Sequence, residues 1–218
     1  MSDGVSAETT APKQPLPQAQ RRERTVQKLC DATIELMVEK GFSRVTTPLV
    51  AKRAGVSRGA LTHYFASREE LIVYAIDHHL TRVNERLFAF AEQIPEGKED
   101  ASEIVDYLWD TMSNGLFFMT MEFLPEARIN KGFHDALIPV VKEFHEGLDA
   151  IWNAFAQGHG LESQRAATVL NMTMCLIRGM IAQTITRDDP TYYSEMLDQW
   201  KHILPQLLRS GDRESSAC

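Results

Sequence analysis

A chain of 218 residues with 44% hydrophobic and 24% charged residues is long enough to bury a sizeable core and has an ordinary globular composition. No charge-free apolar run reaches the roughly 20 residues that cross a bilayer, and the first residues lack a signal-peptide pattern, so we expect a cytoplasmic protein without membrane contact. Three widely spaced cysteines argue against a disulfide scaffold and against a cysteine-based zinc site.

The net charge of −7 conceals an uneven distribution along the chain. Residues 21–68 hold ten Lys and Arg against four Asp and Glu, whereas residues 69–218 hold twelve against twenty-four. A basic segment joined to an acidic remainder indicates that only the first part meets a polyanion. The alternative is a chance excess of solvated cationic side chains.

The first elements are predicted from local signals. Residues 1–20 contain Pro, Ser, Thr and Gly without an apolar period, which predicts a disordered arm. Apolar residues at helical spacing predict a helix over residues 22–40. The segment TTPLVAKRA predicts a short second helix ending near Ala54, with Thr47 as its N-cap and Pro48 at its first position.

The stretch GVSRG at residues 55–59 fits the Gly-x-Ser-x-Gly pattern of a hydrolase nucleophile elbow. Such an elbow needs a β-strand before its first glycine, but here a predicted helix stands in that place. Gly55 suits the left-handed conformation of a tight turn, and Ser57 suits the N-cap of a third helix running to about Phe65. Two short helices joined by such a turn in a basic segment indicate a helix-turn-helix, which inserts its second helix into the major groove of DNA. Ser57 is therefore predicted to be a helix cap.

The remainder of the chain is predicted to be helical throughout. SREE at residues 67–70 is a capping box that begins a long fourth helix, and later breaks fall at IPEGKED, RINKGF, QGHGLES and TRDDP. Pro139 either kinks a long helix or begins a new one. Residues 163–186 are apolar nearly all round, which predicts burial on more than one side.

The stretch GFSRVTTPLVAKRAGVSRGALTHYFASREEL resembles the N-terminal domain of TetR-type bacterial repressors, over about residues 22–72. The resemblance implies an all-α chain: a three-helix DNA-binding domain containing the helix-turn-helix, followed by a helical ligand-binding and dimerisation domain. It also implies a homodimer, in which the last two long helices pair with their copies as a four-helix bundle. The expected division is a disordered arm over 1–20, the DNA-binding domain over 21–66, the helical domain over 67–210 and a flexible tail over 211–218.

The contacts to a double-stranded DNA operator are expected from the second and third helices and from the start of the fourth. Carried over from the resemblance, some residues are expected to contact phosphates, which fix register, and others to reach base edges, which specify sequence. Arg58 is the best candidate for a bidentate contact to guanine, with a phosphate contact or a solvated charge as its alternative. His63 alternatively covers the DNA backbone. The phosphate contacts are expected from Thr47, Tyr64 and Arg68, and the base contacts from Arg58, Thr62 and His63.

A small-molecule effector is expected in the second domain. Residues 101–130 are dense in aromatic and methionine side chains, which usually means core, but adaptable Met residues also favour an apolar cavity. Asn171 and Arg178 are polar residues with apolar neighbours, so they need partners in the backbone, in the other subunit of the dimer or in a ligand. If the partner is a ligand, Arg178 favours one with a carboxylate. The expected contacts to an apolar, aromatic or acyl effector are Trp109, Phe117, Met121, Asn171, Met174 and Arg178.

Two classes of function follow. The preferred one is a ligand-responsive regulator, a homodimeric repressor that an effector releases from a palindromic operator through movement of the fourth helix. The alternative is an enzyme or carrier that uses the helical cavity. The sequence carries no Gly-rich phosphate loop, metal cluster or catalytic-triad signature, so we expect no catalytic residue, no cofactor and no metal.

Overall fold

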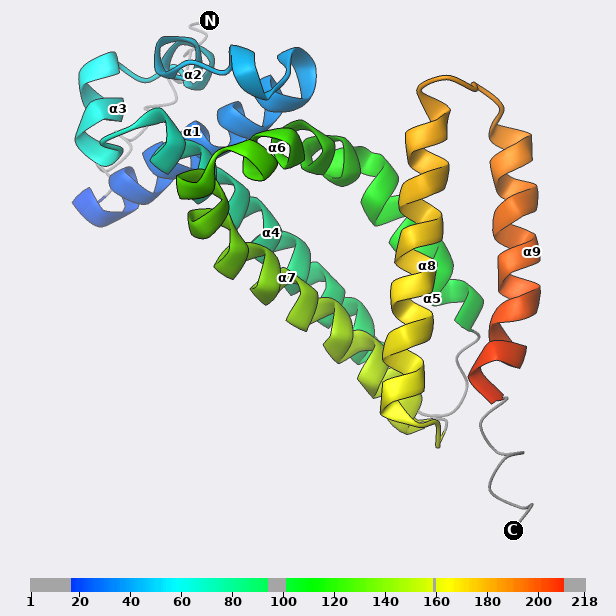
Figure 1. Cartoon of the computed structure of the whole chain (residues 1–218). Helices are drawn as coiled ribbons and strands as arrows, with labels where there is room; N and C mark the ends of the chain where they lie inside the picture. The colour runs from blue at the N-terminus through cyan, green and yellow to red at the C-terminus, as the bar shows by residue number, and fades with distance from the viewer. Residues whose placement is uncertain (1–16, 94–100, 159, 210–218) are drawn as a thin grey trace, which may run out of the picture.

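The computed structural model describes residues 17–93, 101–158 and 160–209, and within these ranges the chain is helical without any strand (Figure 1). The all-α prediction is confirmed. In chain order the elements are α1 (Gln18–Lys40), the 3₁₀ turn η1 (Phe42–Arg44), α2 (Thr47–Ala54), α3 (Arg58–Tyr64), α4 (Arg68–Gln93), α5 (Ala101–Thr111), the π-type turn η2 (Met112–Leu116), α6 (Phe117–Ile129), α7 (Lys131–Gly158), α8 (Ser163–Thr184) and α9 (Pro190–Arg209). No helix within the described ranges is long and apolar enough to cross a membrane.

Helices α1, α2 and α3 gather at one end of the molecule (Figure 1). Their shared core contains Leu29, Leu36, Val50 and Leu61, each buried to 1% exposure or less. Helix α1 begins at Gln18, so the prediction of a disordered arm is wrong for residues 18–20. Gln and Arg are good helix formers, which allows α1 to extend beyond its apolar stripe. The rest of the predicted arm lies outside the described residues.

The N-cap of α2 is Thr46 and not Thr47, which corrects the prediction by one residue. Thr46 has extended backbone angles, and its carbonyl accepts the N–H of Val50 at 2.9 Å. Thr47 therefore occupies the first helical position and Pro48 the second. Both positions tolerate proline, because the first N–H groups of a helix have no intrahelical acceptor.

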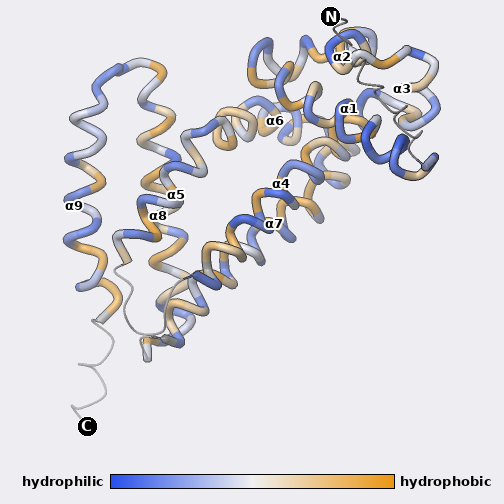
Figure 2. The backbone as a smooth tube through the Cα atoms, turned by 180° about the vertical axis from the view of Figure 1, so that it is seen from behind, coloured by the Kyte–Doolittle hydropathy of each residue, from blue (hydrophilic) through white to orange (hydrophobic). Residues whose placement is uncertain are grey.

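Two long helices, α4 and α7, run side by side from the α1–α3 end toward the far end (Figures 1 and 2). Asn130 precedes α7, and its side-chain oxygen accepts the N–H of Phe133 at 3.1 Å, as a helix cap does. Pro139 lies inside α7, so the alternative that it begins a new helix is wrong. Along both helices, hydrophobic and hydrophilic residues recur in every turn (Figure 2), as expected for helices that pack against the protein on one side.

Helices α8 and α9 form a hairpin at the end remote from α3 (Figure 1). The predicted breaks at RINKGF, QGHGLES and TRDDP are confirmed, since α7 begins at Lys131, α8 at Ser163 and α9 at Pro190. The predicted break at IPEGKED and the predicted tail over 211–218 lie outside the described residues. Between α5 and α6, Gly115 has a φ of 101°, and this left-handed conformation redirects the chain.

Candidate DNA interface and effector pockets

The turn between α2 and α3 has the geometry of a helix-turn-helix. Gly55 adopts the left-handed conformation with φ 65°, and Ser57 is the N-cap of α3. The Ser57 hydroxyl accepts the N–H of Ala60 at 3.2 Å, so the prediction of a helix cap is confirmed. A nucleophile elbow requires a β-strand before its first glycine, but helix α2 precedes Gly55, so this requirement is not met.

Helix α3 has one face in the core and one face in solvent. Leu61 and, at the C-cap, Phe65 are buried, whereas Arg58, Thr62 and His63 are exposed. The three expected base-reading side chains are thus accessible together. Leu61 anchors the centre of the seven-residue α3 in the core, so the opposite face of α3 stays turned to solvent.

The hydroxyl of Thr62 lies 3.1 Å from the carbonyl oxygen of Gly59 and 3.2 Å from that of Arg58. Its proton therefore points back into α3, which leaves the hydroxyl lone pairs and the methyl group facing outward. Such a threonine suits an amino group of adenine or cytosine, or the methyl group of thymine. His63 and Tyr64 meet edge to face at 5.4 Å, and Tyr64 is half-buried.

Arg68 was expected to contact a DNA phosphate, and in the structure its guanidinium binds groups of the protein itself. Its Nε donates to the carbonyl of Val45 at 2.6 Å, and one terminal nitrogen donates to the carbonyl of Phe42 at 2.5 Å. The other terminal nitrogen lies 3.3 Å from the Glu69 carboxylate, and the guanidinium covers the Phe42 ring at 4.6 Å. All three nitrogens thus have partners within the protein, because the carbonyls of Phe42 in η1 and of Val45, its C-cap, face the start of α4. Arg68 fastens η1 to α4.

Arg53 is a second cation of the basic segment with an internal partner. It donates to Glu39 at 2.7 and 2.8 Å and to Glu35 at 3.1 Å, which ties α2 to α1. The side-chain hydrogen bonds that Arg53 donates to Glu39 and then to Glu35 raise the pKa of Arg53. The basic excess of residues 21–68 therefore includes cations that hold the domain together as well as cations free for DNA.

The six expected effector contacts do not share one pocket, which corrects the prediction. Phe117 is 8% exposed and belongs to the core, whereas Met121 is 37% exposed on the outside of α6. The buried face of α6 carries Met119 and Phe123, and Met121 is two residues from each, about 200° around the helix. Its helical phase therefore turns it away from the interior.

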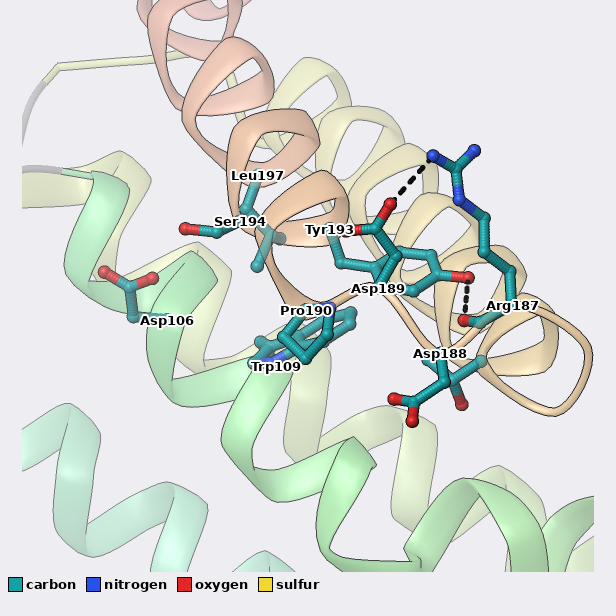
Figure 3. Close-up of a pocket in the computed structure, with 10 residues that line it drawn as sticks. Asp106, Trp109, Arg187, Asp188, Asp189, Pro190, Tyr193, Ser194 and Leu197 are labelled. Atoms are coloured by element: carbon teal, nitrogen blue, oxygen red, sulfur yellow. Dashed lines mark hydrogen bonds and ion pairs between the residues drawn. The ribbon is translucent and has the colours of Figure 1, made fainter.

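Trp109 lines a separate pocket of about 390 Å³ between α5 and the start of α9 (Figure 3). Its ring lies 6.5 Å from that of Tyr193, whose hydroxyl donates to the carbonyl of Arg187 at 3.0 Å. Arg187 in turn pairs with Asp189 at 2.9 Å. These polar groups pair with one another at the α8–α9 turn.

Asn171, Met174 and Arg178 come together in a pocket of about 240 Å³, which we call the α7–α8 pocket. Its lining is His145, Leu148, Asp149, Leu170, Asn171, Met174 and Arg178. Met174 is buried and Asn171 is exposed, so the pocket has an apolar floor and a polar rim. His145 and Asp149 were not predicted from the sequence, because nothing in the α7 sequence indicates which residues of α8 it meets.

Arg178 is the unusual group of the α7–α8 pocket. It is partly buried, and burial lowers its pKa, yet it makes no ion pair or hydrogen bond within the described residues. Burial, and then the Arg178 charge, also lower the pKa of His145. A partly desolvated cation without a partner is the condition under which a bound anion is most stabilising.

Comparison with known proteins agrees with this geometry. Residues 29–75 match the sequence profile described as "Bacterial regulatory proteins, tetR family". An uncharacterised HTH-type transcriptional regulator of Mycobacterium tuberculosis is 28% identical over 127 residues, which cover 58% of this chain and 65% of that protein's length. The HTH-type transcriptional regulator CymR of Pseudomonas putida is 22% identical, over 79% of this chain and 85% of that protein.

A solved structure extends the likeness to the whole fold. The transcriptional regulator FadR of Bacillus subtilis, solved in complex with stearoyl-CoA, superposes with a TM-score of 0.60 at 18% identity. The match covers 84% of this chain and 97% of that one. The second helical domain is therefore shared in architecture, although its sequence has diverged.

Proposed function

Because residues 29–75 belong to the tetR family of bacterial regulatory proteins, we propose that this transcriptional regulator is a cytoplasmic, homodimeric repressor that a small acidic effector releases from a palindromic operator. The observation that carries the repressor proposal is the exposed face of α3, bearing Arg58, Thr62 and His63 on a helix capped by Ser57. Arg58 reads guanine, while Thr47 and Tyr64 contact phosphates. Arg68 positions η1 against α4 and does not contact DNA.

The dimer is proposed to form through the α8–α9 hairpin. Met172 on α8 and Ile203 on α9 are each 45% exposed, and Cys175 is exposed on α8. Gly179 has open space where a Cβ would stand, so a second α8 can approach closely. We expect a two-fold pairing of this face to bring two α3 helices to one side of the dimer, as reading of successive major grooves about 34 Å apart requires.

The effector is proposed to occupy the α7–α8 pocket as an acyl or aromatic carboxylate. Arg178 supplies the charge that such a carboxylate needs, and His145 lies at the same site. Leu148, Leu170 and Met174 supply apolar walls. The stearoyl-CoA bound to the Bacillus subtilis FadR supports an acyl ligand as one that this architecture accommodates. Binding acts on DNA through α7, which packs along α4 and so reaches the DNA-binding domain.

The DNA half of the proposal is tested with the promoter region beside the protein's own gene. Specific retardation of this DNA at moderate salt, by a species whose sedimentation mass is that of two chains, is the expected result. A protein that sediments as one chain, or that retards all DNA alike, contradicts the proposed dimeric operator complex.

The effector half is tested by titrating decanoate into the protein–DNA complex, with decanol as an uncharged match of similar shape. Decanoate is expected to release DNA, and Arg178→Gln is expected to raise the required concentration about tenfold, as loss of a charge-assisted contact does. Arg128→Gln removes an exposed arginine of α6 and serves as the control. Release of DNA from the Arg178→Gln protein at the wild-type decanoate concentration contradicts the proposed pocket.

A further inference from the structure

A second cavity lies between the first turns of α4 and of α7, beside the DNA-binding domain, and we call it the α4–α7 groove. Its volume is about 550 Å³, and it shares no residue with the α7–α8 pocket. Its lining is Glu69, Glu70, Val73, Tyr74, Asp77, Asn130, Gly132, Phe133, Ala136 and Val140. We propose that the α4–α7 groove is a binding site for an apolar or aromatic cation, separate from the effector site and in direct contact with the elements that hold α3.

The apolar part of the groove comes from both helices. Val73 and Tyr74 stand on α4, with Phe133, Ala136 and Val140 on α7. The Tyr74 side chain is 45% exposed, which is high for an aromatic residue beside an apolar floor. A ligand that covers this tyrosine removes apolar surface from water and gains free energy in proportion to the area.

The charge of the groove selects a cation. Among the described residues, its only charged lining groups are the carboxylates of Glu69, Glu70 and Asp77, and no Lys or Arg lines it. The carboxylate of Glu70 accepts the N–H of Ala66 at 2.7 Å and that of Glu69 pairs with Arg68, so both have partners. Asp77 is partly buried and has no hydrogen bond or ion pair within the described residues.

Asp77 therefore anchors the cation, and Tyr74 offers an aromatic face to it. A partly desolvated carboxylate beside apolar surface favours a large, weakly hydrated cation over an ammonium ion that must give up a strong hydration shell. The same two features disfavour an anion of equal shape. The ligand class is thus an organic cation with aromatic or branched apolar substituents.

Both walls of the groove are joined to the DNA-binding domain by aromatic contacts. Tyr74 meets Phe65, the C-cap of α3, edge to face at 5.4 Å. Phe133 on the opposite wall meets Phe42 of η1 at 5.2 Å. A ligand that touches Tyr74 and Phe133 together therefore changes how α3 is held relative to η1. Because a ligand shifts an equilibrium only by binding its states unequally, this contact is the route by which binding lowers operator affinity.

The test measures binding of tetraphenylphosphonium to the full chain without DNA, by titration calorimetry, with tetraphenylborate as an anion of the same shape. The wild-type protein is expected to bind the cation and not the anion. Asp77→Asn keeps the shape and removes the charge, and it is expected to weaken binding about tenfold. Ala136→Trp fills the groove from an exposed position and is expected to abolish binding.

Two control variants test whether the cation binds in the α4–α7 groove alone. Glu92→Gln removes an exposed carboxylate farther along the same helix and is expected to leave binding unchanged. Arg178→Gln, which alters the α7–α8 pocket, is also expected to leave binding unchanged, so the two proposed sites fail or succeed independently. The proposal is overturned if tetraphenylborate binds as well as the cation, or if both groove variants keep the wild-type affinity. It is also overturned if Ala136→Trp changes the oligomeric state, because the groove would then be a protein interface.

The link to DNA is measured with the same probe. Tetraphenylphosphonium at saturation is expected to weaken operator binding by the wild-type protein several-fold, and to leave operator binding by Ala136→Trp unchanged. If the cation binds and operator affinity stays constant, the inferred coupling through Tyr74 and Phe133 is wrong.

Discussion

The Oδ1 atom of Asn84 on α4 lies so near Gly147 on α7 that a Cβ at Gly147 would stand 2.5 Å from it. The Nδ2 of Asn84 donates to the carbonyl of Glu143, one turn earlier on α7, at 3.2 Å. The Oδ1 is buried and accepts no hydrogen bond within the described residues. A polar side chain thus crosses between the helix that follows the DNA-binding domain and the helix that contributes to both proposed sites.

Gly147→Ala is expected to destabilise the protein, although alanine is the better helix former by about 1 kcal/mol. Contacts under 3.0 Å to a Cβ require a shift, and the nearest atoms belong to a short, buried side chain. Overpacking of this kind costs about 1–3 kcal/mol, so it outweighs the gain in helix propensity. The free energy of unfolding by urea measures the difference.

The double variant Asn84→Ala/Gly147→Ala isolates the steric clash. Removing the asparagine side chain creates room for the new methyl group, so the double variant is expected to recover most of the loss caused by Gly147→Ala. Gly59→Ala, inside α3 with nothing within 4 Å of the added Cβ, is the control without a clash, and it is expected to show only the gain in helix propensity. Additive effects of the two changes would show that the contact between α4 and α7 is not their cause.

Arg58→Ala is expected to lose discrimination at one base pair in each operator half-site. A bidentate contact to guanine contributes about 1–3 kcal/mol of preference over the wrong base, and Arg58 lies exposed at the first position of α3. The measurement compares the affinity of both proteins for operators in which each base pair is changed in turn. A uniform loss over all these operators would assign Arg58 to a phosphate.

Arg68→Ala is expected to lower stability without changing the salt dependence of DNA binding. The side chain donates to the carbonyls of Val45 and Phe42, and hydrogen bonds from a charged donor contribute about 1.5–3 kcal/mol each before solvent screening reduces them. Each neutralised phosphate contributes about −0.9 to the slope of log affinity against log salt. A slope shallower by about one unit in Arg68→Ala would restore Arg68 to the phosphate contacts.

Arg68→Lys serves as the companion to this variant. Lysine keeps the positive charge, but it lacks the planar guanidinium that donates to two carbonyls and covers the Phe42 ring. We therefore expect Arg68→Lys to be destabilised nearly as much as Arg68→Ala. Full stability of the lysine variant would show that charge alone, and not the donor geometry, holds η1 against α4.

Local chemistry explains which features are predictable from sequence. Gly55, Ser57 and the Ser67–Glu70 pair each act within a few residues, and the structure contains all three, except that the Glu70 carboxylate accepts the N–H of Ala66 where a capping box would use that of Ser67. The serine of the box accepts the N–H of Glu70 at 3.0 Å. Such signals reveal helix boundaries because turn and cap geometry depend only on neighbouring residues.

Features that depend on packing between distant segments are not predictable in this way. Arg68 binds carbonyls 23 and 26 residues earlier in the chain, and no local pattern indicates that η1 presents them there. His145 and Arg178 meet only because α7 and α8 pack at one particular register. The aromatic and methionine-rich composition around Met121 predicts a pocket residue, whereas its phase on α6 places it on the outside.

His79 is a partly buried histidine in the middle of α4, and we expect it to make the stability of the protein depend on pH. Burial lowers its pKa below the ordinary value of 6.5, and the neighbouring charges of Arg86 and Arg82 lower it further, against the opposing effect of Asp31. The unfolded chain therefore binds this proton more readily than the folded protein, so the free energy of unfolding is expected to fall as pH decreases from about 7 to about 5.

In His79→Gln, which keeps a polar side chain of similar size, that fall in the free energy of unfolding is expected to be smaller. His145→Gln is measured beside it, because burial also lowers the pKa of His145 and contributes to the same range. Unfolding curves at several pH values decide the matter: if His79→Gln and the wild type lose stability in parallel, His79 does not titrate as its burial implies.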